Sequence, residues 1–465
     1  MCSSSFGLAL LTIVWLSQLN VSSANEENCH FRHLQLDGFE RKCEFREHDR
    51  LLVCFHTVDD KWKSGGENVT TLILCHWSLE KFDPALELHG FPSLRKLVIA
   101  NGSLLELSST FPPETRLLET IKVTGTKLQK LPDRVFSNLI NLRTLDLRNN
   151  NIDDANMTAL DSPSLRHVYL SGNPLKCDKK TKWILDQRKG SLSHKIADKK
   201  SLRCTAPYEN RPLLQVVEII EKLAEECKRT VCECELVYVV GQGGKHIQRQ
   251  LMAFAAVNCS HRGLIEMPGF LPENTTTLRL TGNKIQDLTP LTTNPVYRGV
   301  IDLYLDDNQI ESIVQLEGSS WVDHFRLFSL RGNKLTDLPT YALQNVLQQN
   351  GNAVSLYLGN NSWRCDCLFT PGFQDLIIKY ANLVKDIDDV KCSLTNGDDN
   401  NGKIIRDLTR TEICALPDDD PWINLLDIIN IILASLTILI ISKLIYDYWW
   451  YKKTGKLPWI ITKMP

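Results

Sequence analysis

The sequence lacks an excess of charge of either sign. Its 465 residues contain 53 Lys and Arg against 55 Asp and Glu, so the charge balance indicates no nucleic-acid partner. A disordered chain is excluded as well, because 43% of the residues are hydrophobic. At about 150 residues per domain, the length predicts roughly two to three domains.

Catalytic motifs are missing too. No GxSxG or HExxH occurs, and the 11 His are scattered. Residues 241–245 read GQGGK after an apolar run, but they lack the first glycine of a phosphate-binding loop and the Ser or Thr that follows its lysine. We interpret this segment as a turn, and we expect neither an enzyme nor a cofactor.

Cysteine, in contrast, is abundant, with 15 residues, and this number raises the question of an oxidising compartment. Residues 6–16 are apolar, and Ser22 and Ala24 occupy the −3 and −1 positions of a signal-peptidase site. We therefore expect a signal peptide over residues 1–24, although no Lys or Arg precedes the apolar run. A buried N-terminal helix is the alternative.

A second apolar segment, residues 423–446, lies near the C-terminus. About 20 helical residues cross the hydrocarbon layer of a membrane. Asp fills positions 418–420 and Lys residues follow the segment, so the positive-inside rule predicts a single-pass type I protein of the plasma membrane, with an extracellular ectodomain and a short cytosolic tail at 447–465. Asn430 lies within the segment, where its amide can bond to another helix, and this suggests a homo- or hetero-dimer.

The interior is a repeat array that occurs twice. In the first half, the copies LRKLVI, LETIKV, LRTLDL and LRHVYL begin 24, 24 and 23 residues apart, at Leu94, Leu118, Leu142 and Leu165. In the second half, four copies end at Asn283, Asn308, Asn333 and Asn361. Such a period is typical of solenoids, in which each copy adds one short strand to a parallel sheet. A degenerate earlier copy, VTTLIL, opens at Val69. The first three copies lack the final Asn, and Trp77, Gly102 and Thr126 replace it.

The copies resemble leucine-rich repeats of pattern LxxLxLxxN, and the resemblance is carried most fully by Leu142, Leu145, Leu147 and Asn150. Over residues 29–414 the chain is similar to extracellular leucine-rich-repeat proteins that are anchored by one membrane helix. This resemblance implies an α/β fold with two tandem solenoids, shaped as parallel-sheet horseshoes with disulfide caps, and one transmembrane helix. We expect the first solenoid with its caps at 25–226 and the second at 227–416.

Cysteines fall where the solenoid ends need caps. The resemblance implies that a C-terminal cap pairs Cys365 with Cys392 and Cys367 with Cys414. In a middle cap it implies Cys177 with Cys204, because Lys179 replaces the second cysteine of the C-x-C motif. Two further groups resemble N-terminal caps of unassigned connectivity, and they are Cys29, Cys43, Cys54 and Cys75, then Cys227, Cys232, Cys234 and Cys259. A zinc site is the competing interpretation of the C-x-C pairs, but it requires reduced thiolates, so we expect no metal.

Side chains between the leucines project from the concave face of the predicted sheet. We predict ligand contacts among Lys122, Asp146, Arg148, His167, Tyr169, Arg279, Asp302, Tyr304, Asp306, Arg331 and Tyr357. For any one of them, a solvated sheet face is the alternative.

Residues 176–203 hold ten Lys or Arg against three Asp. We predict a basic patch at the middle cap, formed by Lys179, Lys180, Lys182, Arg188 and Lys189. It would bind a glycosaminoglycan or another anionic partner, whereas the alternative is a solvated basic loop.

Glycosylation sequons begin at Asn68, Asn101, Asn156, Asn258, Asn274 and Asn360. Glycans on these residues would mark faces that are not used for tight binding. Proteins of the resembled family bind other proteins through the concave sheet. We therefore expect a non-enzymatic cell-surface protein that binds extracellular ligands or neighbouring receptors in adhesion, recognition or a co-receptor role. A ligand-sequestering decoy, or a trafficking regulator of another membrane protein, is the alternative.

Overall fold

The computed structural model describes residues 29, 43–154, 160, 162, 164–241, 251–393, 400–414 and 425–455. The expected signal peptide, the sequon at Asn156 and all but the first residue of the GQGGK segment lie outside these described residues.

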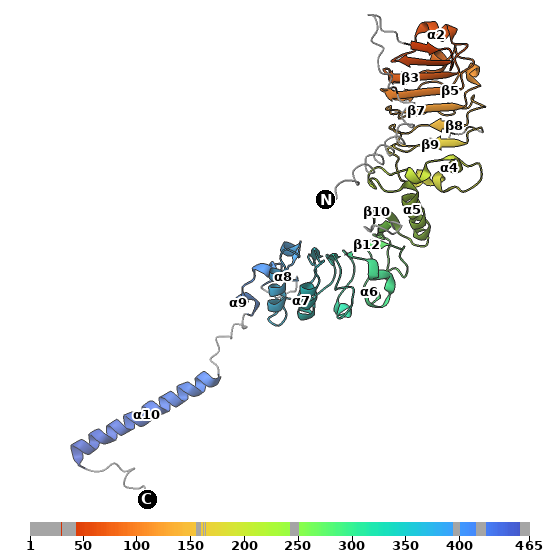
Figure 1. The fold of residues 1–465 in the computed structure, drawn as a ribbon. Helices are drawn as coiled ribbons and strands as arrows, with labels where there is room; N and C mark the ends of the chain where they lie inside the picture. The colour runs from red at the N-terminus through yellow and green to blue at the C-terminus, as the bar shows by residue number, and fades with distance from the viewer. Residues whose placement is uncertain are drawn as a thin grey trace, which may run out of the picture.

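Two stacks of strands follow one another along the chain (Figure 1). The first sheet has the order β1-β2-β3-β5-β7-β8-β9, and its strands are β1 (Cys43–Arg46), β2 (Leu51–Phe55), β3 (Thr71–Trp77), β5 (Lys96–Gly102), β7 (Thr120–Thr124), β8 (Thr144–Asp146) and β9 (His167–Tyr169). The second sheet runs in order from β10 (Glu233–Gly241) through β11 (Leu251–Asn258), β12 (Thr275–Arg279), β13 (Asp302–Tyr304) and β14 (Leu327–Ser329) to β15 (Ser355–Tyr357). Strands β4 (Lys81–Phe82) and β6 (Glu106–Leu107) pair separately.

Short helices return the chain from one strand to the next, and a few longer ones close the stacks. They are α2 (Asp60–Gly65), α3 (Pro84–Glu87), α4 (Leu192–Lys195), α5 (Leu213–Cys227), α6 (Pro290–Thr293), α7 (Thr340–Gln349), α8 (Thr370–Lys379) and α9 (Arg410–Ile413). The 3₁₀ turns are η2 (Pro113–Thr115), η3 (Lys179–Leu185), η4 (Lys199–Ser201), η5 (Pro295–Gly299), η6 (Val314–Leu316), η7 (Ile387–Asp389) and η8 (Ile405–Asp407).

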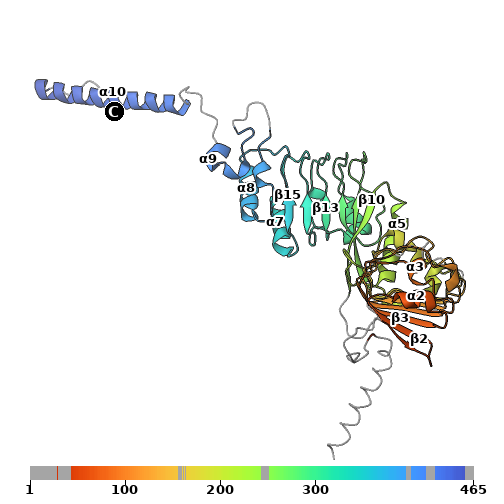
Figure 2. The ribbon, with the colours of Figure 1, turned by 90° about the horizontal axis from the view of Figure 1, so that it is seen from above.

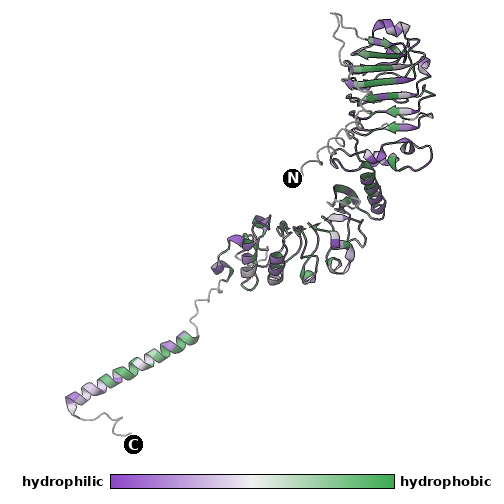
Figure 3. Ribbon diagram, in the orientation of Figure 1, coloured by the Kyte–Doolittle hydropathy of each residue, from purple (hydrophilic) through white to green (hydrophobic). Residues whose placement is uncertain are grey.

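One row of apolar side chains per sheet forms the centre of each core. Parallel pairing in register stacks Leu72, Leu97, Ile121, Leu145 and Val168 in the first sheet. In the second sheet it stacks Val257, Leu278, Leu303, Phe328 and Leu356. All ten are buried, and each such side chain contributes about 1.5–3 kcal/mol by leaving water. The apolar colour follows these strands in Figure 3, so the structure has the two solenoids that the repeats predict.

Buried asparagines connect successive coils. Asn308 Nδ2 donates to the carbonyl oxygens of Leu280 and Leu305, both at 3.0 Å, and its Oδ1 accepts from the backbone N–H of Ile285 at 3.0 Å. The amides that likewise reach the preceding coil belong to Asn150, Asn173, Asn283, Asn333 and Asn361. These bonds satisfy backbone groups that the stack removes from water.

Where the first copies lack asparagine, other residues take its place. Thr126 donates its backbone N–H and its hydroxyl to Asn150 Oδ1, at 3.1 and 2.6 Å. Trp77 is buried against Phe82, and its indole N–H donates to the Lys81 carbonyl at 3.2 Å. Gly102 has a φ of +129°, and a Cβ there would lie 2.4 Å from the Trp77 carbonyl oxygen. A residue without a side chain therefore lets these two coils approach.

Seven disulfides among the described residues close the ends of the two stacks. They join Cys29 to Cys75, Cys43 to Cys54, Cys177 to Cys204, Cys227 to Cys234, Cys232 to Cys259, Cys365 to Cys392, and Cys367 to Cys414. The set includes the three pairs that the resemblance implies. It also assigns the connectivity of both N-terminal caps, which the sequence alone leaves open.

Helix α5 and the β10–β11 hairpin, which begins the second sheet, lie where the two stacks meet (Figures 1 and 2). The buried positions Leu213, Val216 and Val217 give α5 one apolar face. This face belongs to the same hydrophobic cluster as Leu236 and Ala255 of the hairpin, and that cluster continues into the first sheet. Val257, two residues beyond Ala255 on β11, begins the cluster of the second sheet.

The hairpin therefore contributes to both cores. A disulfide from Cys227 of α5 to Cys234 of β10 ties the two elements together. The Tyr208 hydroxyl adds a hydrogen bond to the Leu236 carbonyl at 2.7 Å. The division of the chain into 25–226 and 227–416 stays a prediction. Helix α5 runs across that boundary, whereas the hairpin lies within the second part.

Helix α10 (Leu425–Thr454) is long and apolar enough to cross a membrane. None of its most apolar window is buried against the rest of the protein, and Figure 3 shows apolar residues along most of its length. Ser435, Thr437 and Ser442 return their hydroxyls to backbone carbonyls one turn earlier. Lys443 pairs with Asp447 four residues on. Most polar groups inside the helix thus have partners within it.

Candidate functional site

The concave face of the first sheet brings several predicted residues into two adjacent rows. Register places Lys122, Asp146 and Tyr169 side by side on β7, β8 and β9. Thr144 and His167 form the neighbouring row, and His167 is exposed. Both rows point away from the core, because side chains alternate along a strand.

Arg148 on this face is held by two neighbouring side chains. Its Nε and Nη2 atoms donate to the two Asp146 carboxylate oxygens at 2.9 and 2.6 Å, and its guanidinium lies 5.2 Å from the centre of the Tyr169 ring. The hydrogen bonds that Arg148 donates to Asp146 raise the pKa of Arg148. Asp146 is only 2% exposed, so it positions Arg148 and is less accessible to a ligand than the exposed His167.

The concave face of the second sheet carries a longer continuous row. Register aligns Asn258, Arg279, Tyr304, Ser329 and Tyr357 across five strands. Arg279 stacks over the Tyr304 ring, with its guanidinium carbon 5.0 Å from the ring centre. Burial raises the pKa of Tyr304, while the nearby Arg279 charge opposes that shift. Arg and Tyr are residue types enriched at binding hot spots.

Three predicted contact residues of the second sheet already have partners within the protein. Asp302 is 4% exposed and accepts from Arg326 Nε at 2.8 Å. Asp306 accepts from the Thr281 hydroxyl at 3.3 Å and also from Ser329. Arg331 pairs with Asp389 at 2.7 Å and Asp386 at 3.4 Å, both in the C-terminal cap. These groups hold the face in shape, and they are less available to a ligand than Arg279, Tyr304 or Tyr357.

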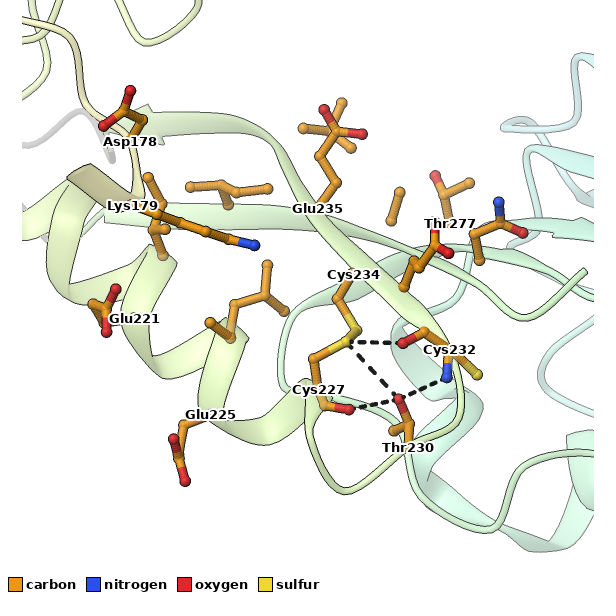
Figure 4. A pocket seen from close by; sticks show the side chains of 18 of the residues that line it. Asp178, Lys179, Glu221, Glu225, Cys227, Thr230, Cys232, Cys234, Glu235 and Thr277 are labelled. Atoms are coloured by element: carbon orange, nitrogen blue, oxygen red, sulfur yellow. Dashed lines mark hydrogen bonds between the residues drawn. A yellow bond between two sulfur atoms is a disulfide. The ribbon is translucent and has the colours of Figure 1, made fainter. Parts of the chain in front are cut away.

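A groove that the sequence did not reveal runs between α5, the hairpin and the second sheet. It has a volume of about 1670 Å³, and its walls include Lys179, Glu221, Glu235, Arg279 and Tyr304. Figure 4 shows Lys179 extending between α5 and the strands, in the same groove that the Cys227–Cys234 disulfide lines. Thr230 fixes the turn there by donating to the Cys227 carbonyl at 2.8 Å. Small-molecule pockets measure about 300–1,000 Å³, so this groove has room for a polypeptide segment.

Two aromatic residues that the sequence analysis missed extend this face onto the hairpin. The rings of Tyr238 and Phe254 lie 5.0 Å apart in paired positions of β10 and β11. Tyr238 is 52% exposed, and its neighbour Val237, which occupies a β-bulge, is 49% exposed. Two apolar runs, LVYVV and the later LMAFAAV, were the feature of the sequence that could have indicated such a hairpin.

The predicted basic patch is partly neutralised. Lys182 pairs with Glu221 of α5, and Arg188 pairs with Asp186 at 2.7 Å. The latter interaction lowers the pKa of Asp186 to about 2, chiefly through the Arg188 side-chain hydrogen bond. Lys179, Lys180 and Lys189 make no ion pair among the described residues, so they carry the remaining positive charge.

The described part of the chain contains no group of three or more His, Cys, Asp or Glu arranged to hold a metal ion. The five sequon asparagines that can be placed, Asn68, Asn101, Asn258, Asn274 and Asn360, are all exposed. Of these five, Asn258 alone lines the groove.

Comparison with known proteins gives matches at both the repeats and the C-terminus. A family model described as leucine rich repeat matches residues 116–175, and one described as the Halfway C-terminal domain matches residues 426–463. Singed wings 2 of Drosophila melanogaster is 37% identical over 401 residues, which cover 85% of this chain and 78% of that protein. Protein halfway of Drosophila pseudoobscura pseudoobscura is 26% identical over 474 residues, which cover 96% of this chain and 73% of that protein.

Among solved structures, a chain of the Toll–Spatzle complex from Drosophila is similar to this one. It is 20% identical, and the match covers 75% of this chain and 52% of that chain with a TM-score of 0.33.

Proposed function

Because the chain belongs to the family of leucine-rich-repeat proteins that includes singed wings 2, we propose that it is a cell-surface protein that binds extracellular proteins and catalyses no reaction. Seven disulfides within the described residues support an oxidising, extracellular setting for the repeats. The protein would act in adhesion, recognition or as a co-receptor.

One observation carries this proposal, namely the row Arg279, Tyr304 and Tyr357, of which Arg279 and Tyr304 line the groove. Arg279 is exposed and both tyrosines are half-buried, so a ligand could finish burying large side chains whose positions are already fixed. Fixed rings and a stacked guanidinium lose little conformational freedom on binding. The first concave face, with Lys122, Arg148, His167 and Tyr169, is the second part of the proposed surface.

For topology, we propose that α10 crosses the plasma membrane with the repeats outside. Tyr446, Trp449, Trp450 and Tyr451 cluster near its end, and Lys452 and Lys453 follow in the last turn. Aromatic residues favour the membrane interface and Lys favours the cytosolic side. This orientation keeps the disulfides extracellular.

The binding proposal is tested by proximity labelling from the full-length chain at the cell surface. The double variant Arg279→Ala/Tyr304→Ala should lose the labelled neighbours that the unchanged chain gains. The matched control, Arg298→Ala/Tyr341→Ala, removes the same residue types from exposed positions in η5 and α7, and it should keep them. Equal labelling by all three chains would contradict a binding role for the second concave face.

A further inference from the structure

Asn258 is a glycosylation sequon that the fold places on the proposed binding face. It is the last residue of β11, it is exposed, and it pairs in register with Arg279 of β12. Arg279 in turn pairs with Tyr304 of β13. Adjacent strands lie about 4.8 Å apart, so Tyr304 is about 10 Å from Asn258, two strand spacings away.

The side chain of Asn258 is oriented for modification. Its Oδ1 accepts a hydrogen bond from the backbone N–H of Ser260, the third residue of its own sequon, at 3.1 Å. No acceptor for its Nδ2 is found among the described residues. Nδ2 is the atom to which an N-linked sugar attaches, and in the folded protein it has room to carry a glycan at the groove.

From this geometry we propose that an N-glycan on Asn258 gates the second concave face. In the transfer reaction, Asn258 Nδ2 forms a bond to C1 of a lipid-linked oligosaccharide, the C1–O bond to the lipid diphosphate breaks, and the amide gives up one proton. The attached sugars are bulky and hydrated, and they lie over Arg279 and Tyr304. The glycosylated form is closed to a protein ligand there, whereas the unmodified form presents the full row.

The same strand end also explains why both forms would occur. Cys259, the middle residue of the sequon, is bonded to Cys232 in the cap of the second stack. Closure of that disulfide holds Asn258 in a paired strand, whereas transfer requires an accessible, extended chain. Glycosylation and cap closure therefore compete at this position, and the outcome sets how much of the protein can bind.

The other placed sequons offer a contrast. Asn68, Asn101, Asn274 and Asn360 are exposed but are absent from the groove lining. Glycans on them attach outside the groove that Arg279 and Tyr304 line. Asn68 lies in the first stack, before β3, and it supplies a matched control.

The proposal rests on the proposed binding function, but its test needs no ligand. Glycopeptide mass spectrometry of the full-length chain in detergent should find a glycan on part of the Asn258 population. Hydroxyl-radical oxidation then measures access to Tyr304, with Tyr341 as the internal reference because it is 80% exposed on α7. Trimming by endoglycosidase to a single sugar, or the variants Asn258→Gln and Ser260→Ala, should raise the oxidation rate of Tyr304 severalfold.

The control variant Asn68→Gln should leave that rate unchanged. Absence of a glycan from Asn258 in every fraction, or equal Tyr304 rates in the unchanged chain and both sequon variants, overturns the gate. Failure of the binding proposal gives a different result. In that case the variant Arg279→Ala/Tyr304→Ala labels the same neighbours as the unchanged chain, whereas the effect of the glycan on Tyr304 oxidation is still seen in chains that retain Tyr304.

Discussion

At the residue scale, the asparagine that closes each repeat stabilises more than its own turn. Asn308 holds groups of its own coil and of the preceding one, through Leu305, Leu280 and Ile285. It is 6% exposed, so water cannot replace these bonds. A buried backbone group left without a partner costs about 1–3 kcal/mol.

We therefore predict that Asn308→Ala lowers the free energy of unfolding of the ectodomain by about 2–4 kcal/mol. Alanine leaves the Ile285 N–H without its acceptor. It also removes one of two amide donors from each of the Leu280 and Leu305 carbonyls, which keep Asn283 and Asn333 as donors. Guanidinium titration followed by tryptophan fluorescence measures the change. The control Asn352→Ala removes an exposed asparagine and should change the value by no more than about 0.5 kcal/mol. Equal effects of the two variants would refute the role of the buried amide.

At the scale of an element, the turn η3 of the middle cap shows how pairing divides a run of charge. Its Lys182 faces Glu221 of α5, whereas Lys179 and Lys180 lie at its start without an ion pair among the described residues. Burial lowers the pKa of Lys199, whose ammonium donates to the Ser193 hydroxyl inside the cap. Only part of the basic sequence thus remains for an anionic partner.

The expected behaviour on a heparin column follows from this division. The variant Lys179→Gln/Lys180→Gln/Lys189→Gln should elute at a clearly lower salt concentration than the unchanged ectodomain. The reason is that three lysines without ion pairs can no longer displace counterions from heparin. Lys182→Gln/Arg188→Gln should shift much less, since Glu221 and Asp186 already engage these two charges. Unchanged elution of the triple variant would support the solvated loop instead.

At the scale of the whole molecule, the β10–β11 hairpin couples the two stacks. Its buried face packs on α5 and the first core, its strand β11 continues into the second sheet, and the Cys227–Cys234 disulfide fastens it. A cap shared in this way makes the unfolding of one stack expose the core of the other. The two solenoids should therefore unfold together.

Leu236 and Val237 allow a paired test, because they are neighbours with 5% and 49% exposure. Leu236→Asp buries an unpaired charge and should lower the free energy of unfolding by more than about 3 kcal/mol. Calorimetry should then show a single transition for the whole ectodomain, moved to a lower temperature. Val237→Asp, in the exposed bulge, should leave the transition within a few degrees of its original position. Two transitions, with the upper one unchanged by Leu236→Asp, would show that the stacks unfold independently.

The sequence by itself determined the repeats, their inward rows and the cap cysteines. Periodicity along the chain converts directly into stacking, because each copy can bury its apolar face only against the next. It also determined the apolar C-terminal helix, whose length and composition are local properties. For the same reason the concave positions Arg279, Tyr304 and Tyr357 could be chosen from register alone.

Only the tertiary structure decided which of those positions are available. Asp302 is paired with Arg326, and Arg331 is paired with Asp389. These partners are 24 and 58 residues away in the sequence, and no local sequence pattern indicates contacts at such separations. The groove and the location of Asn258 within it depend on how α5 and the hairpin pack between the two sheets. A sequon is a three-residue signal, but whether it lies on a binding face is a property of side chains that meet across strands.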